Sequence, residues 1–131
     1  IVILTNPEPT ALTDAYALIK VLFTRYQEKQ FRILVNSARN AADAKEVYRK
    51  LSVVTDRFLN VSLDYLGYIP YDKSVPDAVR AQKPFLQMFP GGGASRALNA
   101  LVARFADPPE ANAKGTLQFF IGNLVSMADA R

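Results

Sequence analysis

The 131-residue sequence contains neither cysteine nor histidine, and these two absences remove several classes of function. Without cysteine the chain has no disulfide framework and no thiol chemistry, which suits the cytosol. Without histidine it lacks the commonest general base and the commonest metal ligand, so Ser-His catalysis and zinc sites are excluded. Apolar runs are also short, and none approaches the roughly 20 residues of a membrane span. The net charge of +4 is only a mild bias towards polyanions or anionic lipid.

Half of the residues are apolar, which suffices for a core in a single domain of this length. Residues 1–5 are an apolar run, the pattern of a strand that is covered on both faces. Because the chain opens directly into this strand pattern, without a methionine or a leader, we expect a piece of a longer protein.

Strand patterns at residues 1–5, 31–36 and 61–69 alternate with amphipathic helical patterns. Thr10 and Asn40 are the predicted N-caps of the first two helices. Further helices are predicted over residues 74–82, 94–106 and 115–128. This order predicts parallel βαβ units and therefore an α/β fold. In a sheet of only three strands, residues 1–5 can form an exposed edge, which again points to missing neighbouring strands.

The apolar stripes of two helices are predicted to face the core. The members of the two stripes are Ala44, Val47, Tyr48, Leu51, Val54, Thr55 and Phe58, and then Ala97, Leu98, Leu101, Val102 and Phe105. The outer face of the earlier helix carries charges of both signs, so we interpret it as solvated rather than DNA-binding. Residues 90–93, Pro-Gly-Gly-Gly, are predicted to be a flexible joint.

Each predicted strand runs into a polar loop. Glu8 follows the first strand, Asn36 ends the second, and Pro70-Tyr71-Asp72 follows the third. In open α/β sheets, ligands bind beyond the carboxyl ends of parallel strands. We therefore expect these polar residues to meet at one rim, and we place the candidate site there.

Residues 6–16, together with Asn36 and residues 69–75, resemble the MinD/ParA family of P-loop ATPases. The match is closest to its FlhG/FleN branch, the regulators of flagellar number and placement, which also carries motifs similar to residues 54–59 and 115–120. The resemblance implies the C-terminal half of a P-loop NTPase (SIMIBI/MinD-like) domain. This half-domain is a partial three-layer parallel sheet flanked by helices over residues 1–106, with a linker at 107–114 and an amphipathic helix at 115–131.

The resemblance also implies roles for residues at the rim. Asn36 would hydrogen-bond the adenine edge, and the backbone of Pro70, Tyr71 and Asp72 would line the other side of the ring. Asp72 has the alternative role of capping the following helix. Glu8 and Thr10 would lie at the interface of an ATP-bound dimer, where Glu8 would reach the partner's ribose. The alternative for Glu8 is an exposed turn carboxylate.

The family's phosphate loop and its two catalytic aspartates have no counterpart in these residues. The segment from Gly91 to Arg96 is no substitute, because no strand precedes it and no Lys-Thr pair follows it. We therefore assign no catalytic and no metal-binding residue. ATP with Mg²⁺ is expected only in the full-length protein, and this chain alone is expected to bind no cofactor and to be inactive.

In the flagellar branch the last helix targets the membrane, and residues 115–128 have an apolar face suited to this. Its members are Leu117, Phe120, Ile121, Leu124 and Val125. A basic flank is missing, so packing back on the domain is the alternative.

The resemblance further implies an ATP-dependent homodimer that is cytoplasmic and peripheral at the inner face of the membrane. Its partners would be the GTPase FlhF, switch-complex proteins or a flagellar transcription activator, with no specific nucleic acid. Two other functions stay open. One is a non-enzymatic interaction module, and the other is a ParA-type DNA partition ATPase.

Overall fold

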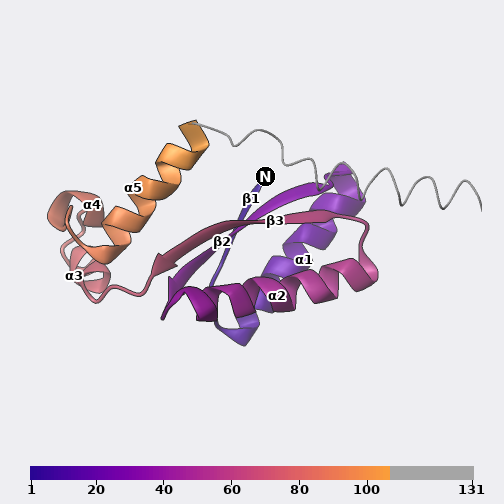
Figure 1. The fold of residues 1–131 in the computed structure, drawn as a ribbon, viewed down its shortest axis with the longest axis horizontal. Coiled ribbons are helices and arrows are strands. Elements are labelled where there is room, and N and C mark those ends of the chain that lie inside the picture. Colours follow the sequence, from indigo (N-terminus) through magenta and orange to yellow (C-terminus); the bar gives the residue numbers. More distant parts are fainter. Residues whose placement is uncertain (107–131) are drawn as a thin grey trace, which may run out of the picture.

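The computed structural model describes residues 1–106, which form a small parallel sheet with helices on both faces (Figure 1). The predicted linker and last helix, residues 107–131, lie outside the described residues. The strands are β1 (Val2–Thr5), β2 (Gln30–Ala38) and β3 (Ser62–Pro70). The helices are α1 (Pro9–Tyr26), α2 (Ala41–Phe58), α3 (Ser74–Arg80), α4 (Phe85–Met88) and α5 (Gly93–Ala106).

The three strands lie in the order β1-β2-β3, and both pairings are parallel. Helices α1 and α2 connect consecutive strands and lie on one face of the sheet, whereas α5 packs against β3 on the opposite face (Figure 1). The α/β class and the three-stranded parallel sheet predicted from the sequence are therefore confirmed. No helix within residues 1–106 combines the length and the apolar character that crossing a bilayer requires.

The core lies between the sheet and the α1–α2 layer. Its fully buried members are Ile3, Ala15, Ile19, Phe31, Ile33, Val35, Ala38, Ala44, Val47 and Leu51. On β2 these residues alternate with less buried ones, as expected for a strand whose two faces differ. The opposite face is less well covered, because α5 packs mainly on β3, and Leu4 of β1 is 59% exposed.

The start of α1 differs from the prediction. Thr10 is not the N-cap, because the helix already begins at Pro9 and Glu8 occupies the cap position without a side-chain hydrogen bond. A proline is well suited to the first position of a helix, where its missing N–H would have no partner in any case. For α2 the prediction is confirmed, since the Asn40 side-chain oxygen accepts a hydrogen bond from the Asp43 N–H at 2.9 Å.

The predicted inner stripes are wider than the surface that the structure buries. Val54 and Phe58 of α2 are 40% and 63% exposed, and Val102 and Phe105 of α5 are 58% and 47% exposed. A narrow sheet contacts only the centre of each stripe, so the flanking apolar side chains stay at the surface. The outer face of α2 is a mixed-charge surface, as expected, and Arg49 forms an ion pair with Glu46 at 2.7 Å.

A β-bulge in β3 allows α5 to approach the sheet. The register moves from Ile33 opposite Tyr65 to Leu34 opposite Gly67, which leaves Leu66 as the extra residue. Gly67 has φ 142°, and a Cβ there would lie 3.0 Å from Leu101 of α5. The Leu66 carbonyl, turned out of the ladder, accepts a hydrogen bond from the Arg104 guanidinium at 3.2 Å. Only glycine fits both the backbone conformation and the close contact.

Candidate functional site

The carboxyl ends of the three strands meet at one edge of the sheet, because all three strands are parallel. At the ends of β2 and β3, Ala38 pairs with Pro70, and the Tyr71 N–H donates to the Ala38 carbonyl at 2.8 Å. At the ends of β1 and β2, Asn6 and Asn36 line the same pocket. The structure thus brings Asn36 and the Pro70 turn to the same end of the molecule.

Asn36 lies in an irregular end of β2. Between the pairs Val35–Tyr68 and Ala38–Pro70 the ladder shifts register, and Ser37 adopts the left-handed conformation with φ 58°. Such a conformation costs about 1–3 kcal/mol in a residue other than glycine and is concentrated at functional sites. A bulge re-aims the side chains next to it, and the Asn36 side chain is exposed at the rim. Its amide offers both a donor and an acceptor to a ligand.

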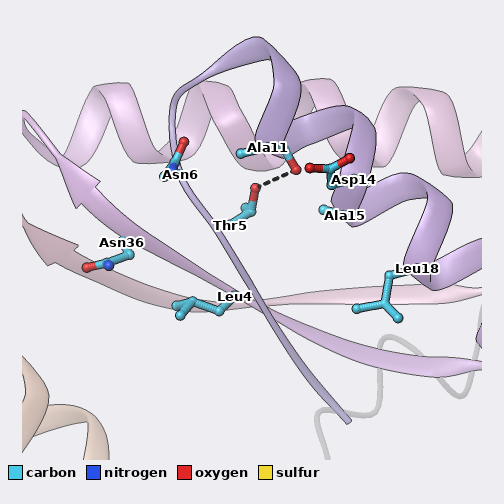
Figure 2. A pocket seen from close by; sticks show the side chains of 8 residues that line it. All are labelled: Leu4, Thr5, Asn6, Ala11, Asp14, Ala15, Leu18 and Asn36. Carbon is cyan, nitrogen blue, oxygen red and sulfur yellow. Dashed lines mark hydrogen bonds between the residues drawn. The ribbon is translucent and has the colours of Figure 1, made fainter.

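A pocket of about 300 Å³ runs along β1 and α1 and reaches Asn36 (Figure 2). Its lining residues are Leu4, Thr5, Asn6, Ala11, Asp14, Ala15, Leu18 and Asn36. The Thr5 hydroxyl donates to the Ala11 carbonyl at 3.2 Å and joins the end of β1 to the first turn of α1. The volume is at the lower limit of small-molecule sites.

Sequence reasoning did not assign the α1 side of this pocket to a site. Ala11 and Leu18 are each three or four residues away from the adjacent pair Asp14 and Ala15, so all four residues lie on one side of α1. That spacing is visible in the sequence. It does not identify a pocket by itself, because the sequence does not show whether another element covers this side of the helix.

The loop between β1 and α1 holds Glu8 at the surface. The Asn6 side-chain oxygen accepts a hydrogen bond from the Glu8 N–H at 2.8 Å, which forms an Asx turn, and prolines flank Glu8 on both sides. Glu8 and Thr10 are exposed, and neither lines the pocket. Their assignment to a dimer interface stays a prediction.

Asp72 connects the rim to the helices that follow it. One carboxylate oxygen accepts hydrogen bonds from the Ser74 hydroxyl at 2.6 Å and the Ser74 N–H at 2.9 Å, and the other accepts from the Ala94 N–H at 3.1 Å. The bond from the Ser74 hydroxyl, followed by those from the Ser74 and Ala94 N–H groups, lowers the pKa of Asp72 to about 2. The Asp72 carboxylate therefore accepts from the N–H of Ser74, the first residue of α3, and from the N–H of Ala94, the second residue of α5. The nucleotide contact, which concerns its backbone, stays a prediction.

Two of the three glycines after α4, Gly92 and Gly93, are part of this arrangement rather than a flexible joint. Gly93 is the first residue of α5, and a Cβ on Gly92 would lie 2.9 Å from an Asp72 carboxylate oxygen and 3.2 Å from the Phe89 carbonyl. The prediction of a flexible joint over residues 90–93 is therefore wrong for Gly92 and Gly93. The sequence could not show this, because the atom that leaves no room for a Cβ at Gly92 belongs to Asp72, 20 positions earlier in the chain.

No group of three or more acidic side chains within residues 1–106 is arranged to hold a metal ion. At the rim, this part of the chain presents the exposed amide of Asn36, the backbone turn at Pro70 and the N-termini of α3 and α5. Such a set suits recognition of a planar, polar ligand edge better than acid–base chemistry.

Two curated proteins are similar to this chain over most of its length. The antiactivator FleN of Pseudomonas aeruginosa is 44% identical over 119 residues, which cover 90% of this chain and 42% of that protein. The flagellum site-determining protein YlxH of Helicobacter pylori is 25% identical over 114 residues, which cover 86% of this chain and 38% of that protein. The chain thus spans about two-fifths of the length of these relatives. No protein-family model matches it.

We expect Asp72→Asn to reduce stability in a pH-dependent way. The carboxyl has a pKa of about 2 in the folded chain against an ordinary value of 3.8, so its stabilisation is present above about pH 4 and is lost as the pH falls towards 2. The melting temperature of the variant should lie several degrees below that of the wild type at pH 5–7. The difference should shrink between about pH 4 and 2. Asp77→Asn, which removes the same charge from the exposed side of α3, is the control. A difference that persists unchanged at pH 2 would contradict this role.

The neighbouring glycines provide a second, matched test. Gly92→Ala should lower the melting temperature, because its Cβ meets the Asp72 carboxylate, whereas a methyl group on Gly91 would have no neighbouring atom within 4 Å, so that position should tolerate alanine. In open space, Gly→Ala stabilises by about 0.4–1 kcal/mol through the unfolded state, so the two variants should shift in opposite directions. The effects of Gly92→Ala and Asp72→Asn should not add, because the two residues are in contact. Full additivity in thermal or urea unfolding would show that the contact is unimportant.

Proposed function

This chain belongs, over nine-tenths of its length, to the FlhG/FleN branch of flagellar regulators, and we propose that it forms the base-recognition half of a MinD-like ATPase. The whole protein would regulate flagellar number and placement. The names of the two relatives, an antiactivator and a site-determining protein, support a regulatory role of this kind.

The observation that carries this proposal is the convergence of Asn36 and the Pro70 turn at the carboxyl ends of parallel strands. An adenine edge presents a donor and an acceptor side by side, and the exposed Asn36 amide can satisfy both. The backbone at Pro70 and Tyr71 is held by the bond from Tyr71 to Ala38 and by the Asp72 caps. A rigid turn of this kind can contact the plane of a base without reorganising.

We assign phosphate binding, metal binding and dimerisation, the other steps of an ATPase cycle, to the whole protein rather than to this chain alone. The triphosphate and Mg²⁺ would be held by residues that this chain does not contain, since residues 1–131 include no phosphate-loop motif. Glu8, on the loop between β1 and α1, and Thr10, in the first turn of α1, would contact the partner in an ATP-dependent homodimer. The support for this is the Asx turn that holds Glu8 exposed.

The membrane part of the proposal rests on residues 115–128. Their apolar spacing suits a helix that lies in the membrane interface. The protein would attach at the inner face of the membrane. FlhF, switch-complex proteins or a flagellar transcription activator are the proposed partners.

We predict that Asn36→Ala weakens ATP binding several-fold in a whole protein that carries this chain, because one base-edge donor and one acceptor are lost. Asn99→Ala, on the exposed side of α5, is the matched amide control and should bind normally. Calorimetry that finds the same ATP affinity for Asn36→Ala as for the wild type would rule out the base contact.

For the membrane proposal, Phe120→Glu should abolish co-sedimentation with anionic liposomes, because it places a charge on the predicted apolar face. Gln118→Glu adds the same charge on the opposite face and should have a much smaller effect. If both variants lose liposome binding equally, the added charge alone explains the loss. If both variants still bind liposomes as the wild type does, the membrane assignment is wrong.

A further inference from the structure

Strand β2 contains one residue more than its packing requires. Up to Val35, buried residues alternate with less buried ones, as in a regular strand. Asn36 and Ser37 are then both exposed before Ala38, which is fully buried in the core. A single exposed residue between Val35 and Ala38 would have kept the alternation, so burial does not explain the second one.

The additional residue forms a β-bulge at the end of β2. The pairs Val35–Tyr68 and Ala38–Pro70 enclose two residues on β2 but only one on β3. Ser37 takes up the difference by adopting the left-handed conformation, with φ 58°. Side chains other than those of asparagine and aspartate rarely favour this conformation, so the bulge is held at a cost in backbone strain.

The strain at Ser37 has no counterpart elsewhere in the described residues. Gln27 and Gln82 also have positive φ, but they lie at the C-terminal ends of α1 and α3, where the left-handed conformation commonly ends a helix. Within residues 1–106, Ser37 is the one residue other than glycine that adopts it inside a strand. Neither chain reversal nor core packing therefore accounts for the conformation of Ser37.

The backbone is fixed on both sides of the bulge. The Val35 and Ala38 side chains are fully buried, and the Ala38 carbonyl accepts a hydrogen bond from the Tyr71 N–H at 2.8 Å. Shifting these two neighbours cannot absorb a change of backbone conformation at Ser37. Such a change would instead turn Asn36, the other exposed residue between them.

We propose that Ser37 is a positioning residue whose bulge aims the Asn36 amide at the base. In a regular strand, Asn36 would follow Arg32 and Leu34 on the face of the sheet opposite the core. A bulge re-aims the side chains beside it, and Asn36 lies with Asn6 at the rim end of the pocket (Figure 2). This role rests on the proposed function, because it requires that Asn36 contacts the adenine edge.

The test uses a whole protein that carries this chain and changes Ser37 in three ways. Deletion of Ser37 restores the regular alternation, so the melting temperature should stay within a few degrees of the wild-type value, while the ATP affinity should fall several-fold. Ser37→Val should also weaken ATP binding, because a β-branched side chain disfavours the left-handed conformation. Ser37→Gly is the matched control. It adopts that conformation without strain and should bind ATP within about twofold of the wild type.

The Asn36→Ala background separates positioning from a general structural effect. If Ser37 acts through Asn36, deletion of Ser37 should cause no further loss of ATP affinity in that background. Equal losses in both backgrounds would overturn the inference. It would also be overturned if the deletion and Ser37→Val bind ATP normally in a protein that Asn36→Ala does weaken. If the deletion variant does not fold, Ser37→Val and Ser37→Gly provide the same comparison. An Asn36→Ala protein that binds ATP as the wild type does would contradict the base contact itself, and the role of Ser37 with it.

Discussion

The parallel register of the sheet is the constraint on which the other features depend. Because β1, β2 and β3 all run in one direction, their three following loops leave the sheet at the same edge. The bond from the Tyr71 N–H to the Ala38 carbonyl extends the ladder by one residue beyond the end of β3. It holds the turn after β3 against the end of β2, two residues from Asn36. The rim is thus a consequence of strand direction and of the pairing at the strand ends.

Asp72 extends this order from the sheet to the helices beyond it. The Asp72 carboxylate accepts hydrogen bonds from the first turns of both α3 and α5. The N-terminal ends of the two helix dipoles are partially positive and favour its negative charge. Gly92 is required for the close approach of α5. The rim, the α3–α4 segment and the start of α5 are therefore one connected unit, although they are separated by some 20 residues in the chain. A ligand at the rim would contact a surface that is already held in place, which reduces the entropy cost of binding.

The molecule is well packed on one side of its sheet and open on the other. The buried core lies between the sheet and the α1–α2 layer, whereas Leu4 and Val2 are exposed on the opposite face and Val102 and Phe105 are exposed on α5. Parallel sheets are normally covered on both faces. The exposed side chains lie on β1 and on α5, at the face of the sheet that α5 covers only in part.

The residue pattern alone was enough to predict the alternation of strands and helices, the α/β class, the parallel topology and the placement of Asn36 and the Pro70 turn at one rim. These follow from local periodicity and from strand direction, which neighbouring residues encode. It also identified the Asn40 cap, which depends on contacts three residues away. The exposure of Val54, Phe58, Val102 and Phe105 became clear only from the folded arrangement, because it depends on the width of the sheet beneath each helix. The contact between Asp72 and Gly92 at the start of α5, and the position of Asp14 in a pocket, were likewise found only in the structure. Each of these features joins separate elements, and no local sequence pattern gives the distance between them.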